Sequence, residues 1–329
     1  MSARLVLAGS VIVDIVLRVP HLPERGGDVL ASAAGQTAGG GFNVLAAARR
    51  LGLPAVYAGG HGTGPFGDLV RTALAGEGIT PLLHARTDRD TGYCVALVDA
   101  DGERTFVTAS GAEGALIAED AGETARQLRP GDLVQLSGYG LAYPESADRL
   151  TDFAASLPEG IVLCLDPGPL VADIAPDRLE RVLARVNWLS CNRREAHLLT
   201  GLADGAAAAE ALASRLRPGA GAGAGTGGVV VRGDADGCWV VDGRGTAVAV
   251  PGRPVELVDS NGAGDAHVGA FLALLGHGAE PQEAARGANV AASVAVTRHG
   301  PATGPTLAEL TAVLGPSDPL SALLAEAGP

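Results

Sequence analysis

The sequence predicts an α/β fold in which helices flank both faces of a doubly wound, mostly parallel sheet, with a small β-sheet lid. Two observations support this prediction. Short apolar runs alternate with helical stretches along most of the chain, as in the βα units of a parallel sheet. Residues 14–36 and 91–108 break the alternation, because they show period-two patterning and turn residues instead of helices.

The apolar runs have the length and composition of buried parallel strands. They cover residues 5–8, 55–58, 133–136, 161–165, 188–191 and 229–231. The helical stretches cover residues 43–51, 66–76, 147–155, 177–186, 195–200 and 205–216, and a further apolar helix is expected over 266–275. We therefore expect a layered molecule with a central sheet.

The two regions without helices are expected to form a small sheet that projects from the body as a lid. Their turns are marked by Pro-Glu-Arg-Gly-Gly at 23–27 and Asp-Ala-Asp-Gly at 99–102. No linker divides the chain, so residues 1–329 are expected to form a single domain. The glycine- and alanine-rich stretch 218–228 is interpreted as a flexible surface connection rather than a phosphate-binding loop.

Composition and charge exclude some classes of binding partner. Hydrophobic residues make up 47% of the chain and charged residues 19%, which suits a packed core and excludes a disordered polar chain. The formal net charge is −13, with acidic residues spread along the chain. This argues against nucleic acid or an anionic membrane as a partner, because both select for basic patches. Phosphate groups remain compatible, since backbone amides and metal ions can hold them.

Cysteine usage and the N-terminus predict a soluble, cytoplasmic protein. No long apolar leader or run of about 20 apolar residues is present. Cys94, Cys164, Cys191 and Cys238 lie far apart and form no C-x-x-C pair, so they are expected to be free thiols. The seven histidines have no H-x-x-x-H spacing, which argues against a zinc site.

The turn Ser260-Asn261-Gly262-Ala263-Gly264-Asp265 precedes an apolar helical stretch. Small residues at a helix start let backbone N–H groups converge on one anion, which the helix dipole also favours. A carboxylate at the same turn would face that anion, and accepting a hydroxyl proton would explain its presence. An ordinary helix start, with Asp265 as a first-turn acid, is an equally good interpretation of this segment alone.

A second glycine-rich segment, Gly39-Gly40-Gly41-Phe42-Asn43, also leads into a helix. The glycines permit close approach of a ligand, and Asn43 offers donors and an acceptor for hydroxyl groups. The alternative is that this segment is a hinge between lid and body, with Asn43 as the cap of the helix. Asp14 follows the first strand, where ligands usually bind in α/β sheets.

Asn192-Arg193-Arg194-Glu195 follows a predicted strand and opens a helix. The N-x-x-E spacing would suit a hydrated metal and phosphate oxygens. A capping box, in which Asn192 and Glu195 bond to each other's amides, is the simpler interpretation of this segment alone.

The segment Gly62-Thr63-Gly64-Pro65-Phe66-Gly67 fits the dinucleotide pattern G-x-G-x-x-G. It is not in the first βα turn, it contains a proline, and no acidic residue closes a second strand about 20 residues later. We therefore do not expect a nicotinamide site here.

Together, these segments resemble the PfkB (ribokinase-like) family of carbohydrate and nucleoside kinases along essentially the whole chain. The matching segments, in order, are Gly9-Ser10 with Asp14, Gly39 to Asn43, Asn192 with Glu195, Arg232-Gly233 with Gly237, Asp259 to Asp265, Ala288-Asn289 and Val296 to Gly300. The resemblance implies a ribokinase-like fold, ATP and Mg²⁺ as cofactors, and a K⁺ ion as a further candidate.

The resemblance also implies roles for individual residues. Asp265 would be the catalytic base, and the amides of Gly262, Ala263 and Gly264 would form the anion hole for the γ-phosphoryl group. The implied substrate-binding residues are Asp14, Gly39, Gly40, Gly41, Asn43 and Asp265. The implied nucleotide-binding residues are Asn192, Arg232, Gly233, Asp234, Gly237, Gly264 and Asn289. Glu195 would act on Mg²⁺ through water. A monovalent cation would lie among Asp259, Asn261, Ala295, Arg298 and Gly300, held mostly by main-chain carbonyls. The lid of this family often forms the interface of a homodimer.

The chain departs from the ribokinase pattern at several positions. Gly39-Gly40-Gly41 stands where ribokinases have Gly-Gly-Lys-Gly, and Ser137-Gly138-Tyr139 stands where they have a glutamate. Both departures weaken ribose as the substrate. Asn261 replaces the usual Thr or Ile, and Asp234 occupies a position often held by glycine.

The expected function is ATP-dependent phosphorylation of a hydroxymethyl group on a neutral sugar. A nucleoside kinase of the same fold is the first alternative, because the ribokinase lysine is missing and Phe42 could stack on a base or sugar. Packing in the helix is the other role open to Phe42. A sugar- or nucleotide-binding regulator without catalysis is the second alternative.

Overall fold

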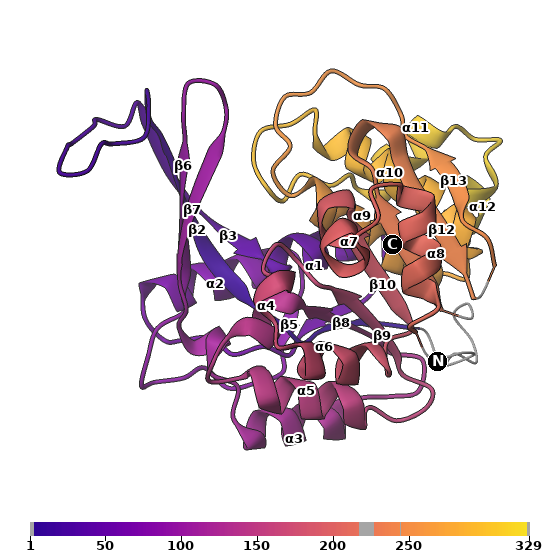
Figure 1. The fold of residues 1–329 in the computed structure, drawn as a ribbon, viewed down its shortest axis with the longest axis horizontal. Helices are drawn as coiled ribbons and strands as arrows, with labels where there is room; N and C mark the ends of the chain where they lie inside the picture. Colours follow the sequence, from indigo (N-terminus) through magenta and orange to yellow (C-terminus); the bar gives the residue numbers. More distant parts are fainter. Residues whose placement is uncertain (1–2, 217–226, 244, 328–329) are drawn as a thin grey trace.

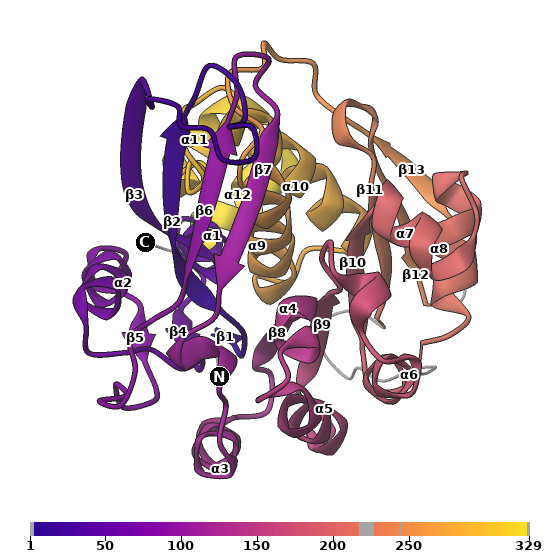
Figure 2. The same cartoon turned by 60° about the vertical axis from the view of Figure 1, so that its left-hand side comes forward.

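The computed structural model describes residues 3–216, 227–243 and 245–327, and its described part forms a nine-stranded sheet, a four-stranded lid sheet and flanking helices (Figures 1 and 2). The large sheet has the strand order β13-β12-β11-β10-β9-β8-β1-β4-β5. Its strands are β1 (Leu5–Leu7), β4 (Ala55–Tyr57), β5 (Thr80–Pro81), β8 (Leu133–Ser137), β9 (Val162–Asp166), β10 (Trp188–Asn192), β11 (Gly228–Arg232), β12 (Gly237–Asp242) and β13 (Val248–Pro251). Neighbouring strands pair in parallel from β5 to β11, and β12 and β13 add antiparallel pairs at one edge.

Each face of the sheet is buried under a separate layer of helices, which explains why the strands are apolar throughout. In β1, Leu5 and Leu7 belong to one hydrophobic cluster and Val6 to the other, as expected when side chains alternate between faces. The first face is covered by α1 (Gly41–Arg50), α2 (Pro65–Gly76), α9 (Ala263–Gly276), α10 (Pro281–Ala295), α11 (Leu307–Leu314) and α12 (Pro319–Ala327). The second is covered by α3 (Ala118–Gln127), α4 (Gly138–Ala142), α5 (Ala147–Ser156), α6 (Pro176–Leu183), α7 (Arg193–Thr200) and α8 (Gly205–Ala213).

The lid sheet has the strand order β3-β2-β6-β7 and rises from one side of the body (Figure 1). Its strands are β2 (Val11–Arg18), β3 (Ala33–Gly40), β6 (Tyr93–Val98) and β7 (Arg104–Ala109). The predicted lid regions are therefore confirmed, although β2 begins before residue 14 and β3 continues to Gly40. Asp14 lies inside β2, so its expected place at the end of a body strand is wrong. The apolar sequence that follows β1 is interrupted at Gly9 and Ser10. At these two residues the chain passes from the body into the lid strand β2.

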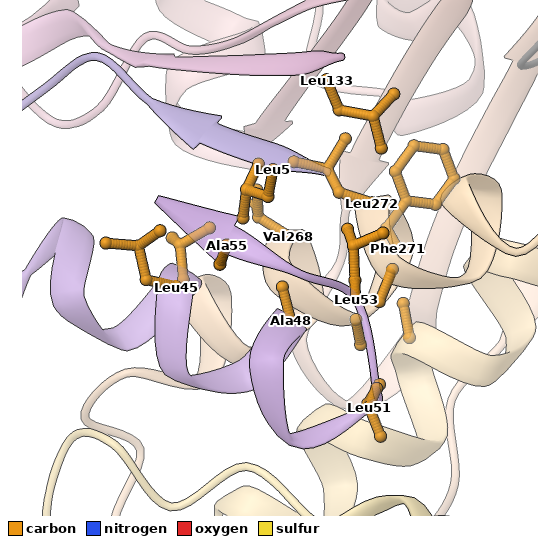
Figure 3. Close-up of a cluster of buried hydrophobic side chains, with 14 of the residues drawn as sticks. Leu5, Leu45, Ala48, Leu51, Leu53, Ala55, Leu133, Val268, Phe271 and Leu272 are labelled. Carbon is orange, nitrogen blue, oxygen red and sulfur yellow. The ribbon is translucent and has the colours of Figure 1, made fainter. Parts of the chain in front are cut away.

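The strand order reverses between β1 and β8, and helix α9 packs beneath this switch point. Val268, Phe271 and Leu272 of α9 pack among Leu5 and Leu133 of the two strands (Figure 3). Ligands of doubly wound sheets bind at the carboxyl ends of the strands at such a point. The start of α9 therefore lies in the expected ligand region.

The strands and helices predicted from the sequence are of the same type in the structure, although their first and last residues differ. The six predicted body strands and the helices predicted between them are all present. The helix predicted from Asn43 begins at Gly41, so Asn43 lies within α1 and its alternative role as a cap is wrong. The antiparallel strands β12 and β13 were not expected, because strand–helix alternation predicts only parallel pairs.

Most of the predicted flexible connection, residues 218–228, lies outside the described residues; Gly228 begins β11. Within the described residues, no helix combines the length and the apolar character that crossing a membrane would require. Cys94, Cys164, Cys191 and Cys238 are buried and free, as predicted.

Candidate active site

Polar residues terminate four adjacent strands of the large sheet. Ser137 ends β8, Asp166 ends β9, Asn192 ends β10 and Arg232 ends β11. Because parallel strands share one direction, these side chains meet at the same edge. Each strand is buried along its length and ends in a polar residue, so a polar edge lies on top of the packed core.

Helix α9 begins at this edge with a turn that only glycine can form. Gly262 has φ +73°, and a Cβ atom there would lie 1.9 Å from the carbonyl oxygen of Pro301. Among the described residues, the amides of Gly262, Gly264 and Asp265 have no backbone or side-chain acceptor, while the Ala263 amide donates to the Ser260 carbonyl at 3.3 Å. The helix start therefore offers free donors together with the positive end of the helix dipole.

The Asp265 carboxylate is held by Asn43, which comes from the other end of the chain. Asn43 Nδ2 donates to Asp265 Oδ2 at 2.9 Å. A Cβ atom on Gly269 would lie 2.4 Å from the Val44 carbonyl oxygen, so α1 and α9 cross at a distance that only glycine permits. This close crossing brings Asn43 to Asp265.

The surroundings of Asp265 make it a better proton acceptor than an ordinary aspartate. Burial raises the pKa of Asp265 to about 7, and the negative charges of Asp166 and Asp14 add to the rise. The hydrogen bond from Asn43 and the positive charge of Arg232 oppose it. A carboxylate with a pKa near neutrality suits general-base chemistry.

Arg232 lies at the centre of a charged cluster beside the α9 turn. Its Nη2 atom is 3.1 Å from Asp166 Oδ2 and 3.8 Å from Glu195 Oε2, and its Nη1 atom donates to Ser190 Oγ at 2.6 Å. A Cβ atom on Gly264 would lie 3.7 Å from the guanidinium. Asp166 was not anticipated, because no sequence spacing connects it to Glu195 or Arg232. Its position at the end of a predicted strand, before Pro167-Gly168, was the available signal.

Asn192 and Glu195 form the capping box that the sequence suggested. The Asn192 side chain accepts from the Glu195 amide at 2.8 Å, and Glu195 Oε2 accepts from the Asn192 amide at 2.8 Å. Burial and the nearby Asp166 raise the pKa of Glu195, which Arg232 partly offsets. The capping interpretation is confirmed, and it leaves Glu195 facing the charged cluster.

Asp14 reaches the site from the lid, directly over the glycine segment. A Cβ atom on Gly39 would lie 2.0 Å from Asp14 Oδ2, so the carboxylate occupies the space that a side chain would fill. Burial raises the pKa of Asp14 to about 6. Gly40 has φ +60°, and Gly41 packs against Leu7. The three glycines thus have different tasks, and only Gly39 directly makes room for a predicted substrate-binding group.

Two further side chains, Tyr139 and Cys94, belong to this part of the site. Burial raises the pKa of Tyr139, and the charges of Cys94, Tyr143, Asp265 and Asp166 add to the effect. The Tyr139 ring packs beside Gly168, and Cys94 lies opposite Asp14 in the lid sheet. Tyr139 was noticed in the sequence only as a replaced glutamate, and Cys94 only as a free thiol.

Phe42 does not face the site. Its side chain is 6% exposed and belongs to the core cluster that includes α1 and α9. The packing interpretation of Phe42 is confirmed, and stacking on a ligand is excluded in this conformation.

The predicted nucleotide-binding segment forms a rim around Trp239. A Cβ atom on Gly233 would lie 2.6 Å from Trp239, the Arg193 guanidinium stacks 4.7 Å from the centre of the Trp239 ring, and Gly237 has φ +97°. Asp234 has φ +53°, a conformation that favours glycine.

Asn289 is more deeply placed than the rest of the predicted nucleotide border. Its Nδ2 atom donates to the carbonyls of Val250 and Pro251 at 3.0 and 3.2 Å, and its Oδ1 atom lies 3.2 Å from His267 Nε2. The residue therefore ties α10 to β13 and α9.

The loops predicted to surround a monovalent cation do come together. Asp259 Oδ1 accepts from the Asn261 amide at 2.9 Å, and Asp259 Oδ2 accepts from the Gly300 amide at 3.1 Å. The Ala295 carbonyl accepts from the Arg298 amide at 3.1 Å, and the Arg298 side chain turns towards Glu309 at 2.6 Å.

A cleft of about 410 Å³ lies between the lid and the α9 turn, a size typical of small-molecule sites. It is lined from the lid by residues 102–104 and Phe106, and from the body by residues 260–265. Two segments far apart in the sequence thus line one cleft, and the free amides and Asp265 belong to its body side.

The carboxylates of this edge fit a hydrated Mg²⁺ ion. Among the described residues, no three acidic, histidine or cysteine side chains form a complete metal cage. Mg²⁺ in phosphotransferases is held by one or two carboxylates, water and substrate phosphates. Glu195 and Asp166, which both lie beside Arg232, match that donor set.

The G-x-G-x-x-G segment from Gly62 to Gly67, where no nicotinamide site is expected, has a structural role. The Asp90 carboxylate accepts from the Phe66 amide at 3.0 Å and from the Gly67 amide at 2.8 Å. The first amides of α2 are therefore satisfied within the protein, in contrast with those of α9.

Comparison with known families agrees with this fold. Residues 2–307 match the family model described as "pfkB family carbohydrate kinase", and the chain belongs to this family of ATP-dependent sugar kinases.

Among individual relatives, the uncharacterised sugar kinase YegV of Escherichia coli is 31% identical over 305 residues, which cover 92% of each chain. The ribokinase of Haemophilus influenzae is 29% identical over 305 residues, covering 91% of this chain and 94% of its own. The crystal structure of Thermotoga maritima ribokinase superposes with a TM-score of 0.79 at 24% identity and covers 95% of this chain and 99% of its own. The nucleoside kinase of Burkholderia thailandensis, solved with inosine, has a TM-score of 0.75 at 20% identity and covers 94% and 95%. These structural matches establish the ribokinase fold.

Proposed function

We propose that this protein transfers the γ-phosphoryl group of ATP to a hydroxymethyl group of a neutral sugar, with Asp265 as the base. The observation that carries the proposal is the pairing of Asp265, whose pKa is raised to about 7, with the free amides at the start of α9. The carboxylate accepts the hydroxyl proton as the oxygen attacks phosphorus. The amides of Gly262 and Gly264 stabilise the charge on the transferring group, and the Ala263 amide joins them when its weak turn bond is released.

A neutral acceptor fits the charges on the lid side of the site. Asp14, Asn43 and Tyr139 offer hydrogen bonds to hydroxyl groups, and none of them carries a positive charge. Asp14 would meet an anionic acceptor with repulsion. The arginine that lines the cleft from the lid, Arg104, is already paired with Asp259 and so is not free to bind a phosphorylated or acidic sugar.

ATP is proposed to lie along the rim formed by Arg232, Gly233, Asp234 and Gly237, with Asn192 beside its phosphates and Asn289 beneath the rim. When Mg²⁺ is bound, it neutralises phosphate charge, and Glu195 and Asp166 would hold its water shell. Arg232 would meet the phosphates from the other side of the charged cluster.

The principal test is an ADP-release assay with a panel of neutral sugars, acidic sugars, sugar phosphates and nucleosides. Turnover with a neutral sugar is the expected result. Preference for a nucleoside would favour the first alternative, although the burial of Phe42 removes one reason for it. Binding of a sugar or nucleotide without any turnover would favour a regulator.

The base is tested with Asp265→Asn, which keeps the shape of the side chain. We expect ATP affinity within about threefold of the wild type and a rate lower by about 10²–10⁴-fold, the usual contribution of a general base. Asp90→Asn, at the structural helix start of α2, is the matched control and should retain the rate. Normal turnover by Asp265→Asn would exclude Asp265 as the base.

A homodimer through the lid is the proposed assembly. The lid carries exposed apolar side chains, with Leu30 at 87% and Val107 at 63% exposure. Light scattering of the wild type and of Val107→Asp tests it; a monomeric wild type would exclude the dimer.

A further inference from the structure

One contact joins the tip of the lid to the turn that begins α9. Arg104, the first residue of β7, forms an ion pair with Asp259 through Nη2 and donates from Nη1 to Ser260 Oγ at 3.1 Å. The side chains of Arg104 and Asp259 are 24% and 12% exposed. The partners lie 155 residues apart in sequence, so the contact depends on how the lid sheet lies against the body.

Asp259 is the anchor of the turn. Its two carboxylate oxygens accept from the amides of Asn261 and Gly300 at 2.9 and 3.1 Å. Burial opposes ionisation of Asp259, but these hydrogen bonds and the charges of Arg104 and Arg18 outweigh it and lower its pKa. The charge of Asp259 is thus balanced by two arginines of the lid.

The same region was expected to hold a monovalent cation, but its residues do not fit one in this conformation. The Thr303 hydroxyl bridges two of the expected ligand carbonyls, at 3.0 Å from that of Ala295 and 3.3 Å from that of Gly300. The Asp259 carboxylate, the only anionic side chain among the five residues expected around the cation, is already paired with Arg104. A bound K⁺ ion would have to displace both interactions.

We propose that Arg104 is a positioning residue that replaces the monovalent cation: with the lid closed, its guanidinium neutralises Asp259 and orders the turn whose amides receive the phosphoryl group. The inference rests on the proposed function, because it assigns that turn to phosphate binding. Two consequences follow. Phosphoryl transfer is independent of K⁺, and the phosphate site is complete only when the lid closes.

The test compares wild type, Arg104→Ala, Arg104→Lys and the matched control Arg25→Ala. Arg25 is an exposed lid arginine with no ion pair among the described residues. Initial rates are measured in potassium, sodium and N-methylglucamine chloride at constant ionic strength. Wild type and Arg25→Ala should give equal rates in all three salts. Arg104→Ala should lose on the order of 10- to 100-fold without K⁺, as displaced catalytic groups typically do.

K⁺ should restore part of the rate of Arg104→Ala, because the vacated carboxylate becomes available to it. The rate of Arg104→Lys without K⁺ should lie between those of the wild type and Arg104→Ala, since lysine keeps the charge but cannot contact Asp259 and Ser260 with two nitrogen atoms. A wild type that needs K⁺, or an Arg104→Ala variant that matches wild type without K⁺, would overturn the inference.

Thermal unfolding supplies a readout that does not depend on kinase activity. The unfolding temperature of the wild type should be the same in potassium and sodium chloride, whereas that of Arg104→Ala should rise specifically in potassium. If no sugar is phosphorylated, the proposed function fails, yet this comparison still decides the role of Arg104. A rise of the wild-type unfolding temperature that occurs in potassium but not in sodium chloride would contradict the proposed role of Arg104.

Discussion

At the scale of single residues, the site depends on carboxyl groups whose ionisation is controlled by burial. Asp265 and Asp14 both lie in the region between lid and body, and burial raises both pKa values. An acid with a raised pKa is a stronger base when ionised but costs folding energy. Activity and stability therefore place opposite demands on the same side chains.

The first prediction concerns pH. Asp265 must be ionised to accept a proton, so kcat/KM for the sugar should rise with pH and level off above about 7. Asn43→Ala removes a hydrogen bond that lowers this pKa, so its profile should shift to higher pH. Initial rates between pH 5 and 9 provide the measurement. Asp14→Asn should keep the rise, which distinguishes the two acids; a profile that stays level down to pH 5 would contradict the assignment.

The second prediction concerns stability. The pKa of Asp265 is higher in the folded protein than in the unfolded chain, so its contribution to stability falls as pH rises from about 4 to about 7. Asp265→Asn removes this cost and should raise the unfolding temperature more at pH 8 than at pH 5.5. The gain is limited to about 1.4 kcal/mol per pKa unit and is reduced by the partial exposure of the carboxyl group. Equal unfolding temperatures for both proteins at pH 8 would contradict a buried, costly charge.

At the scale of elements, the glycines decide how closely segments approach one another. Gly39 lies on β3 beneath the Asp14 carboxylate, and Gly262 forms the left-handed turn before α9. Gly35 on the same strand and Gly264 in the same turn lack such constraints. The contrast supplies matched pairs of substitutions.

The third prediction compares Gly39→Ala with Gly35→Ala on the same strand. A Cβ atom at Gly39 would displace Asp14, whereas nothing lies within 4 Å of one at Gly35. Gly39→Ala should raise KM for the sugar about tenfold or more, equivalent to one lost charge-assisted hydrogen bond, and leave KM for ATP nearly unchanged. Gly35→Ala should behave like the wild type. Equal effects on sugar and ATP would indicate a general disturbance of the lid.

The fourth prediction separates folding from phosphate binding at the α9 turn. Gly262→Ala requires a strained φ and clashes with the Pro301 carbonyl, so it should lower the unfolding temperature sharply. In the free protein Gly264→Ala meets only ordinary contacts with Arg232. It should fold normally but weaken ATP binding and turnover, because its methyl group covers the free amides. Full activity of a folded Gly264→Ala protein would argue against this anion site.

At the scale of the whole molecule, the lid and the body together line the cleft in which we propose that transfer takes place. Asp14 and Arg104 come from the lid, and Asp265 and Asp259 come from the start of α9 and its preceding turn. Neither half contains all the groups proposed for transfer. Sugar binding should therefore favour closure and complete the site.

The fifth prediction follows from this division. ATP hydrolysis without sugar should be slower than sugar phosphorylation by roughly 100-fold or more, because water does not gain the positioning that a bound acceptor supplies. ADP release measured with and without the preferred sugar tests it. Rapid hydrolysis without sugar would show that closure does not depend on the acceptor.

Sequence patterns predicted the local features well. Alternating apolar runs and helical stretches indicated the parallel strands, because burial on both faces requires continuous hydrophobic sequence. The Gly262 to Asp265 turn is recognisable in the sequence because small residues at a helix start suit an anion, although an ordinary helix start fits the same segment equally well. Asp14 was assigned correctly as a candidate near the site but to the wrong kind of element, since its neighbours suit either a body strand or a lid strand.

What the sequence by itself determined is the fold class, the lid regions and the residue types of the reactive turn, since these depend on periodicity and backbone preference within a few residues. Only the tertiary structure decided that Asn43 meets Asp265, that Asp166 shares Arg232 with Glu195, and that Arg104 pairs with Asp259. Each of these contacts joins segments brought together by the crossing of α1 and α9, by strand order or by the lid. Charge, burial and distance across such contacts have no signature in local sequence, because they arise when the sheet and its two helix layers pack.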